Sequence, residues 1–501
     1  MTPANPDARG VPDAPGDPVA GLAERLALLV GADRLVTDPV ELAAYECDGL
    51  THYRVVPALA VLARSRDDVR AVVAACASAG VPFVARGAGT GLSGGAVPHA
   101  TGVLLVMAKM RAILELDIAS QRAVLEPGVA NLDVTRAVAP YGYYYAPDPS
   151  SQQVCSIGGN VAENSGGAHC LKYGFTTNHV TGLEVVTPDG EVVELGSKAA
   201  DPPGYDLTGA FVGSEGTLGV VTKVTVRLVR APQSVQTILA GFGDIDAAGA
   251  AVSAIIATGM VPAAIEMMDA LAITAAEAAV GCNYPEGAGA VLIVELDGPA
   301  ADVAHGLEEV ERHCIESGAF EIRRAADDAE RSRIWVGRKS AFAAVGRISP
   351  DYIVQDGVVP RTALEEVLRD IEVLATEKGI RVANVFHAGD GNLHPLVLFD
   401  AGVEGELARA EEVSARILDI CLAHGGSITG EHGVGLDKVK AMSKMFGEDD
   451  LATMLLLRDA FDPGGLCNPG KLFPTPRLCG EAPGRRSGVH PLVESGVADL
   501  F

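Results

Sequence analysis

Residues 81–110 read VPFVARGAGTGLSGGAVPHATGVLLVMAKM. Apolar and β-branched residues at both ends predict two strands, over 81–86 and 102–110, which a glycine loop connects. Glycine lets successive backbone N–H groups point into one concavity, where they can bind a pyrophosphate without opposing side chains. The stretch therefore predicts a sheet whose loop binds phosphate or, in the simpler alternative, only closes the sheet.

The glycines of this loop match a dinucleotide-binding pattern only in part. Gly89, Gly91 and Gly94 satisfy G-x-G-x-x-G, but a Rossmann site requires a helix directly after the loop. Here Pro98 and Gly102 intervene before a strand, and no Lys-Ser/Thr pair ends the loop as in a Walker motif. The sequence thus favours a phosphate-binding loop of another architecture.

Two further glycine-rich stretches follow along the chain. Residues 148–174, DPSSQQVCSIGGNVAENSGGAHCLKYG, carry paired glycines and few charges, and residues 211–226, FVGSEGTLGVVTKVTV, place glycines just before a β-branched run. The stretch 148–174 is too poor in apolar residues to be expected as a core element, and it suits groups that hydrogen-bond a large polar ligand. Three such loops favour a long cofactor over a small ligand, with ordinary turn chemistry as the alternative.

The periodicity around these loops predicts two α+β domains, as expected for a chain of 501 residues. Before residue 232 the expected elements are a strand, an amphipathic helix, a hairpin and a short helix, over 57–63, 67–80, 113–128 and 130–142. After it come two β-α-β units, over 234–269 and 288–324, which predict a sheet backed by helices. The expected organisation is a disordered lead-in at 1–20, domains at 21–232 and 233–474, and a loose tail at 475–501.

The overall charge excludes some classes of partner. Lys and Arg total 39 against 65 Asp and Glu, a formal net charge of −26. Such a chain repels phosphate backbones and anionic lipid surfaces, so nucleic acid is not an expected partner. An anionic substrate would need a local cationic pocket.

The cysteines and the chain start indicate a cytoplasmic protein. The nine cysteines form no CxxC pair and no repeated spacing, which indicates buried thiols in a reducing compartment and no iron–sulfur site. The first twenty residues lack the basic start and apolar region of a secretory signal. No run approaches the ~18 apolar residues of a membrane span, so membrane association would be peripheral and through a partner.

Two histidines and a carboxylate suggest a metal site in the second domain. In VANVFHAGDGNLHPLVLF, His387 and His394 flank a GDGN turn that predicts a hairpin, and SITGEHGVGLDK presents Glu431 and His432 between glycines. Two imidazoles and one carboxylate form the usual ligand set of a catalytic metal with an open position, while His432 would be free to move protons. Satisfied structural histidines are the simpler alternative, and Asp390 could replace Glu431 as the oxygen ligand.

A cationic pair offers an anion-binding position. Arg338 and Lys339 lie on a predicted helix that also carries Trp335, the only tryptophan. Adjacent helical residues point about 100° apart, so only one of the two need face the site. Arg338 is the better candidate for bidentate carboxylate binding, with a solvated helix face as the alternative.

Six motifs in one order carry a family resemblance that covers about residues 35–474. They are RGAGTGLSGG, DPSSQQVCSIGGNVAENSGGAHCLKYG, FVGSEGTLG, HAGDGNLHP, TGEHGVG and NPGKLFP. With them the chain resembles the FAD-linked oxidase family with a vanillyl-alcohol-oxidase-type flavin fold, and within it the flavin subunits of glycolate oxidases and the D-lactate and D-2-hydroxyglutarate dehydrogenases. The resemblance implies a two-subdomain FAD-binding domain followed by an α+β cap domain with ferredoxin-like β-α-β units.

The resemblance also implies FAD-dependent oxidation of a small 2-hydroxy acid to the 2-oxo acid. It implies a divalent metal (zinc, manganese or iron) on His387, His394 and Glu431, with His432 as the catalytic base and Arg338 on the substrate carboxylate. The expected FAD contacts are Arg86, Gly87, Ala88, Gly89, Thr90, Gly91, Ser93, Gly94, Pro147, Asp148, Ser151, Gly158, Gly159, Asn160, Asn164, Gly166, Gly167, Glu215, Gly216, Val220, Val221 and Asn468.

Two departures from the dicarboxylate enzymes favour glycolate or D-lactate. Val354 and Leu396 stand where those enzymes carry a second substrate-binding lysine and an asparagine. Because no iron–sulfur spacing exists, electrons would leave to a separate acceptor, an iron–sulfur subunit or a quinone-linked carrier, in a homodimer or a multi-subunit oxidase.

Several other readings remain open. Within the family they are a D-2-hydroxyglutarate dehydrogenase and a non-redox flavin enzyme like alkylglycerone-phosphate synthase. Outside it they are a metallohydrolase whose glycine loops bind a nucleotide, and a non-catalytic subunit, which the complete cluster of ligands and base disfavours.

Overall fold

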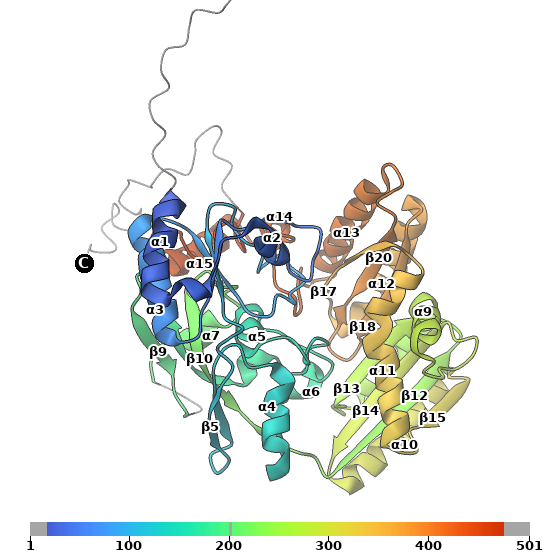
Figure 1. Cartoon of the computed structure of the whole chain (residues 1–501). Helices are drawn as coiled ribbons and strands as arrows, with labels where there is room; N and C mark the ends of the chain where they lie inside the picture. The colour runs from blue at the N-terminus through green and yellow to red at the C-terminus, as the bar shows by residue number, and fades with distance from the viewer. Residues whose placement is uncertain (1–17, 200–202, 475–501) are drawn as a thin grey trace, which may run out of the picture.

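The computed structural model describes residues 18–199 and 203–474. The expected tail at 475–501 and most of the expected lead-in at 1–20 lie outside the described residues. Helix α1 (Pro18–Val30) begins at residue 18, inside the range 1–20. Figure 1 shows two domains, with the first in blue to green on the left and the second in yellow to orange on the right.

The first domain opens with a four-stranded sheet in the order β1-β2-β4-β3. Strands β2, β4 and β3 are parallel and β1 is antiparallel to β2. The glycine loop leads from β3 directly to strand β4, which confirms that no Rossmann helix follows it. The elements are β1 (Leu35–Val36), α2 (Pro39–Leu42), β2 (Leu59–Leu62), α3 (Arg66–Ala79), β3 (Phe83–Arg86) and β4 (Val103–Val106).

Helix α3 shows why this layer forms. Its side chains Val69, Val72, Val73 and Cys76 recur at helical spacing, and all four are fully buried in the core that the sheet shares. The helix ends at Gly80, whose φ of 64° is a left-handed conformation that glycine adopts without strain.

The second layer of this domain is a five-stranded antiparallel sheet in the order β5-β6-β10-β8-β9. The expected hairpin is present as β5 and β6. The elements of this part of the chain are β5 (Ile113–Asp117), β6 (Arg122–Leu125), α4 (Asn131–Val138), β7 (Tyr143–Tyr144), α5 (Ile157–Glu163), α6 (Cys170–Tyr173), β8 (Val180–Val186), β9 (Val192–Gly196), α7 (Leu207–Phe211), β10 (Val220–Arg227) and β11 (Val229–Arg230). Strands β7 and β11 pair with each other in a separate two-stranded sheet.

One expectation for this layer was wrong. The stretch 148–174 was not expected to contribute a core element, yet α5 places Ile157 and Val161 in the core with no exposed surface. The helix forms because Ser156 caps it, its side chain accepting a hydrogen bond from the backbone N–H of Gly159 at 3.2 Å. Two apolar residues four positions apart are enough to bury one face of so short a helix.

The second domain is a nine-stranded sheet whose first four strands lie in the order β15-β12-β14-β13. This is the order of a ferredoxin-like unit, as expected. The elements are β12 (Ser234–Phe242), α8 (Ile245–Ala257), β13 (Ala264–Asp269), α9 (Ala270–Val280), β14 (Ala290–Gly298), α10 (Ala300–Glu316), β15 (Glu321–Arg324), α11 (Asp328–Ala344), β16 (Asp351–Val354), β17 (Gly357–Val358), α12 (Leu364–Lys378), β18 (Arg381–His387), β19 (Asn392–Leu393), β20 (Pro395–Phe399) and α13 (Glu406–Ala423).

Helices cover this sheet on both faces. Along β14, Leu292 and Val294 point into the core shared with α8, α10, α12 and α13, whereas Val291 and Ile293 point into the core shared with α9 and α11. Because successive side chains of a strand point to opposite faces, an unbroken apolar run such as AVLIVEL is what a doubly covered strand requires.

The last described residues return to the first domain. Helix α14 (Val439–Met445) packs against α13, whereas Phe461 of α15 (Glu448–Phe461) contacts Phe211 of α7 in the first domain; both helices are red in Figure 1. Cys467 is buried in the core of the first sheet, and its backbone forms an isolated parallel β-bridge with Phe83 of β3. Within residues 18–199 and 203–474, no helix is both long and apolar enough to cross a membrane.

Candidate active site

A cavity of about 1010 Å³ lies where the two domains meet. The first domain contributes its three glycine-rich loops, and the second contributes α11, β16 and the histidine hairpin. The expected cofactor residues that line the cavity are Arg86, Gly87, Ala88, Gly89, Thr90, Gly91, Ser151, Gly158, Gly159, Asn160, Glu215, Gly216, Val220 and Val221. A volume of this size is at the upper end for ligand pockets and suits a long cofactor such as FAD.

The backbone of the first glycine loop explains why side chains are absent there. Gly89 has a φ of 70°, in the left-handed region. A Cβ on Gly87 would stand 2.2 Å from the Oγ of Ser156, the residue that caps α5. The loop thus packs against a helix N-terminus, and its bare backbone faces a cavity. Both features suit a pyrophosphate.

The remaining expected cofactor residues do not line the cavity. They are Ser93, Gly94, Pro147, Asp148, Asn164, Gly166, Gly167 and Asn468. The Asn468 amide, for example, donates to the backbone oxygens of Gly95 at 2.9 Å and of Glu215 at 2.6 Å. Two of the glycine loops are therefore held together from the far end of the chain.

Replacing Gly89 with valine should yield colourless protein, because the new side chain would strain the backbone and collide with the Arg86 guanidinium. We expect FAD content below a tenth of the parent value, measured by flavin absorbance per chain. Gly379→Val is the matched control: Gly379 also has a positive φ, 62°, but open space around it. It should cost about 1–3 kcal/mol of stability and keep its flavin; equal flavin content in both variants would contradict the role of the loop.

The expected hairpin brings His387 and His394 together. His387 ends β18 and pairs with Asn392 of β19, and the two imidazole rings lie 5.1 Å apart at 86°. The Oε1 atom of Glu431 lies 3.3 Å from Nε2 of His387 and 3.0 Å from Nε2 of His394. Donor atoms bound tetrahedrally at ~2.1 Å to one zinc ion stand ~3.4 Å apart, so the three atoms are spaced as metal ligands would be.

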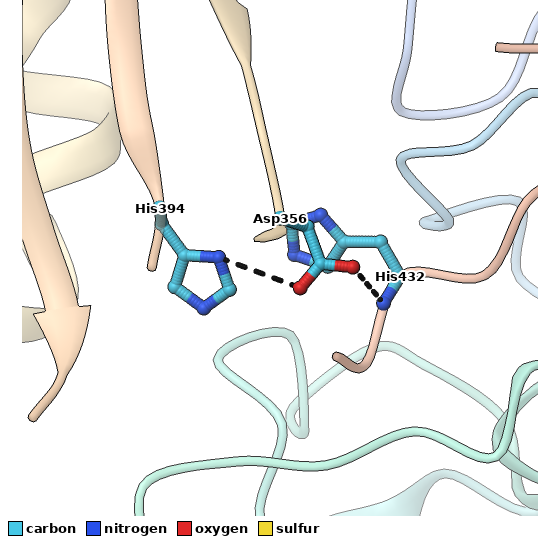
Figure 2. A group of neighbouring side chains, drawn as sticks. All are labelled: Asp356, His394 and His432. Atoms are coloured by element: carbon cyan, nitrogen blue, oxygen red, sulfur yellow. Dashed lines mark hydrogen bonds and ion pairs between the residues drawn. The ribbon is translucent and has the colours of Figure 1, made fainter. Parts of the chain in front are cut away.

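Each of these histidines turns its other ring nitrogen toward a buried carboxylate. Nδ1 of His387 lies 2.7 Å from Glu266, and Nδ1 of His394 lies 3.8 Å from Asp356 (Figure 2). A carboxylate at hydrogen-bond distance fixes the imidazole tautomer and orientation in metal sites, as Glu266 does for His387; Nδ1 of His394 makes no hydrogen bond to a described residue. The donor set and its surroundings therefore fit a divalent metal.

Asp356 also shapes the loop that carries Glu431. It is fully buried and accepts hydrogen bonds from the backbone N–H groups of Gly430 and His432, at 3.0 and 2.9 Å, and from Lys438 Nζ at 3.1 Å. Burial raises the pKa of Asp356, but Lys438 and then His432 outweigh it, so the net pKa lies well below its usual range. A permanent carboxylate thus anchors residues 430–432.

Asp390 is not a ligand in this arrangement. Its side chain accepts from the backbone N–H of Asn392 at 3.1 Å, which is the role of an acidic residue in a tight turn. Among the described residues, the groups able to hold a metal ion combine His387, His394 and Glu431, or Asp356, His394 and His432. In the second group the Lys438 ammonium on Asp356 opposes a cation, so the first group is the better site.

His432 lies beside the cluster with a free ring nitrogen. Its ring stacks on that of His394 at 4.9 Å and 11° (Figure 2), and its Nδ1 is buried without a hydrogen-bond partner among the described residues. Burial lowers the pKa of His432 to about 4, against the opposing charge of Asp356. The imidazole is therefore neutral near pH 7 and able to accept a proton.

The cationic pair is arranged differently from the expectation. Arg338 is 2% exposed, is absent from the cavity wall, and donates from Nε to Glu266 at 2.6 Å. Lys339 lines the cavity instead. Burial raises the pKa of Glu266, but Arg338 and His387 together lower it below its usual value. Arg338, Glu266 and His387 thus form one buried hydrogen-bonded chain behind the site.

Glu266, Asp356 and Lys438 were not expected from the sequence to support the site. Glu266 and Asp356 carried a signal, because a carboxylate inside the apolar run AIEMM, or directly after DYIVQ, is in an unusual place for a charge unless it is paired; Lys438 carried none. All three have relative exposures of 2% or less.

Solved structures establish the fold. The chain superimposes on 4-ethylphenol oxidase from Gulosibacter chungangensis with a TM-score of 0.76 at 18% identity, covering 92% of this chain and 99% of that one. For p-cresol methylhydroxylase the TM-score is 0.76 at 17% identity, with 92% and 97% covered. Alkyldihydroxyacetonephosphate synthase gives 0.71 at 19%, with 90% and 86% covered. The expected α+β fold of the vanillyl-alcohol-oxidase type is confirmed.

Two family models match the two domains separately. Residues 57–196 match the model described as an FAD binding domain, and residues 231–472 match that of the FAD linked oxidases, C-terminal domain. With the glycine-lined cavity, this defines a flavin-dependent oxidoreductase. The expected FAD cofactor is confirmed, and the metallohydrolase alternative is excluded.

Curated relatives narrow the class. The chain is 53% identical to the glycolate oxidase subunit GlcD of Escherichia coli (strain K12) over 90% of both chains, and 40% identical to that of Bacillus subtilis (strain 168) over 86% and 92%. It is 31% identical to the mitochondrial D-lactate dehydrogenase [cytochrome] of Arabidopsis thaliana over 85% of this chain and 74% of that one. The chain belongs to the FAD-linked oxidase family, as the motifs indicated.

Proposed function

We propose that this protein oxidises a small 2-hydroxy acid, glycolate or D-lactate, to the 2-oxo acid and passes the electrons to bound FAD. The observation that carries the proposal is that one cavity is lined both by the glycine loops and by His387, His394, Glu431 and His432. The most similar curated relatives considered above are glycolate oxidase subunits. A site for a hydroxyl proton thus adjoins a site for the cofactor.

We further propose that His387, His394 and Glu431 hold a divalent metal, either zinc, manganese or iron. Bound FAD would supply the two-electron acceptor, and the metal would supply Lewis-acid chemistry at the 2-hydroxyl and carboxylate oxygens. Asp356 anchors the loop that presents Glu431, and Glu266 orients His387. His432 accepts the proton of the 2-hydroxyl as the Cα–H bond breaks.

The substrate carboxylate needs a cation, since the chain as a whole carries a formal net charge of −26. Among the described residues that line the cavity from the second domain, Lys339 is the one Lys or Arg. We propose that Lys339 meets the carboxylate from the cavity. Arg338 remains the alternative, and to serve it would have to turn away from Glu266, with which it is ion-paired at 2.6 Å.

Two alanine variants separate these roles. Lys339→Ala should raise KM for every acid about tenfold or more, with unchanged metal content, because it removes a charge partner. Arg338→Ala should instead weaken metal binding about 10- to 100-fold, because it frees Glu266 from its ion pair and disturbs His387. Steady-state kinetics and elemental analysis measure both. If Arg338→Ala raises KM at full metal content, Arg338 is the carboxylate ligand.

The distal end of the pocket favours a small monocarboxylate. Val354 lines the cavity, whereas Leu396, directly opposite it in register on β20, is fully buried in the core. A second carboxylate beside Val354 would be buried without a partner, which is strongly unfavourable. Val354 thus carries this argument, and Leu396 acts only by filling the space behind it.

We expect glycolate or D-lactate to exceed D-2-hydroxyglutarate in kcat/KM by at least tenfold, measured with an artificial dye acceptor. Val354→Lys should reduce the ratio of kcat/KM for the monocarboxylate to kcat/KM for D-2-hydroxyglutarate. Val336→Lys, at a position 50% exposed on the outside of α11, should leave this ratio unchanged. A preference of the parent enzyme for the dicarboxylate would favour a D-2-hydroxyglutarate dehydrogenase. Absence of flavin reduction by any hydroxy acid would favour a non-redox enzyme like alkylglycerone-phosphate synthase.

The electrons must leave to another molecule. The described cysteines are all free thiols, and none belongs to an iron–sulfur ligand pattern. Because the two glycolate oxidase relatives are named as subunits, we infer that this chain works in a multi-subunit oxidase. Its acceptor would be an iron–sulfur subunit or a quinone-linked carrier, in the cytoplasm or at a membrane through that partner.

A further inference from the structure

A second carboxyl group in the cavity wall has no role in the chemistry above. Glu163 is the last residue of α5, and its side chain lines the cavity beside Glu215 of the third glycine loop. A Cβ on Gly433 would stand 2.3 Å from Oε2 of Glu163 and 2.9 Å from Oε1 of Glu215. The two carboxyl groups are therefore close neighbours.

Glu215 has two partners that stabilise its charged form. Its two oxygens accept the backbone N–H groups of Val434 and Gly435, each at 2.7 Å. Burial raises the pKa of Glu215, but these two N–H donors favour its charged form, so of the two carboxyl groups Glu215 is the one better able to hold the negative charge.

Glu163 has no such partners. Its Oε2 is buried and makes no hydrogen bond to any described residue. The nearby cations are engaged elsewhere, with Lys438 on Asp356 at 3.1 Å and Lys471 on the Val97 oxygen and Asn468 at 2.8 and 2.9 Å. A charge on Glu163 would thus be buried beside Glu215 without an ion pair.

The least costly state for such a group is the neutral acid. Burial raises the pKa of Glu163 well above its usual value, Glu215 and Asp48 raise it further, and Lys438 and Lys471 only partly oppose them. A neutral carboxylic acid carries an O–H donor, which then requires an acceptor. Oε2 is buried toward Gly433, whereas Oε1 lies on the side of the glycine loop, so an O–H on Oε1 could meet an acceptor in the cavity.

The position of Glu163 beside the first glycine loop indicates that the acceptor is an atom of the cofactor. Oε1 of Glu163 lies 2.6 Å from the place of a Cβ on Gly95 and 3.6 Å from that of a Cβ on Gly91. A carboxylate there would repel a pyrophosphate held by the loop, whereas a protonated acid can bond to an acceptor atom of the cofactor. We propose that Glu163 is a neutral carboxylic acid in the holoenzyme and donates a hydrogen bond to bound FAD, with Glu215 keeping it in the acid form.

Infrared spectroscopy tests the protonation state directly. The difference spectrum between oxidised and reduced holoenzyme at pH 7 should contain the carbonyl stretching band of a protonated carboxylic acid. That band should shift when glutamate is labelled with ¹³C and should be absent in Glu163→Gln. Glu194→Gln, at a side chain 73% exposed in the same domain, is the control and should keep the band. A difference spectrum with no band that depends on Glu163 overturns the proposal.

Cofactor affinity tests the hydrogen bond. Apoprotein titrated with FAD, followed by quenching of flavin fluorescence, should give Glu163→Gln a Kd within about threefold of the parent, because an amide is also a neutral donor. Glu163→Met removes the donor at similar size and should weaken binding about 2- to 10-fold, the usual range for one net hydrogen bond. Loss of FAD by the Gln variant, or parent-like affinity of the Met variant, contradicts the proposal.

Discussion

His394→Ala should lose its divalent metal and its turnover while keeping FAD. The Nε2 atoms of His387 and His394 and the Oε1 atom of Glu431 stand at ligand spacing, with separations of 3.3 and 3.0 Å from the carboxylate oxygen. Removing one of three protein ligands leaves too few to hold the ion, and the substrate oxygens then lose their Lewis acid. Elemental analysis should find about one metal per chain in the parent and none in the variant.

The matched control is His424→Ala, at a histidine at the end of α13 whose partners are the acidic groups of α12. It should retain metal and activity. Chelation of the parent should reproduce the His394→Ala phenotype, and added metal should rescue the chelated parent alone. A parent enzyme that carries no stoichiometric metal and turns over in chelator would show that the cluster is structural.

His432→Gln should keep both FAD and metal and still reduce its flavin about 10²- to 10⁴-fold more slowly, the usual contribution of a general base. The physical reason is that His432 is neutral, buried and stacked on His394, with a ring nitrogen free to accept a proton. Glutamine fills much of the same space without a basic nitrogen. Rapid mixing with substrate, followed by bleaching of the flavin absorbance, measures the step directly.

His52→Gln serves as the control for this variant. His52 also lines the cavity, but from the first domain and outside either group of potential metal ligands. Its substitution should leave the rate of flavin reduction within a few-fold of the parent. Equal rates in His432→Gln and His52→Gln would remove His432 from the mechanism.

The part of the site that follows from local sequence was predictable. The spacing of His387 and His394 around GDGN is a hairpin pattern, and the hairpin alone brings their rings together. The glycine loop between two strands was likewise recognisable, and its bare backbone lines the cavity. In both cases neighbours along the chain are neighbours in space.

The part that depends on sheet register was not predictable. Glu266 reaches His387 because β13 lies antiparallel to β18 with these two residues directly opposite each other. The Cβ atoms of such a pair are ~5 Å apart. The two residues are 121 positions apart in the chain, and the sequence of neither strand indicates which residue of the other it will face. Arg338 reaches Glu266 from helix α11, and the packing of that helix on the sheet was likewise not visible in the sequence.

The helix α5 illustrates a different limit. Its sequence, IGGNVAE, contains two glycines and has a low helix propensity. The cap at Ser156 and the burial of Ile157 and Val161 against the five-stranded sheet overcome that propensity. Tertiary packing of this kind is not visible in a composition argument about residues 148–174.

The return of the chain to its first sheet has a consequence for biosynthesis. Phe83 bridges to Cys467, and Asn468 joins the backbone of Gly95 to that of Glu215. While the polypeptide is still emerging from the ribosome, the first domain therefore lacks the segment that fastens two of its glycine loops. A chain cut before residue 467 would lack these hydrogen bonds, so we expect it to bind FAD less tightly than the parent.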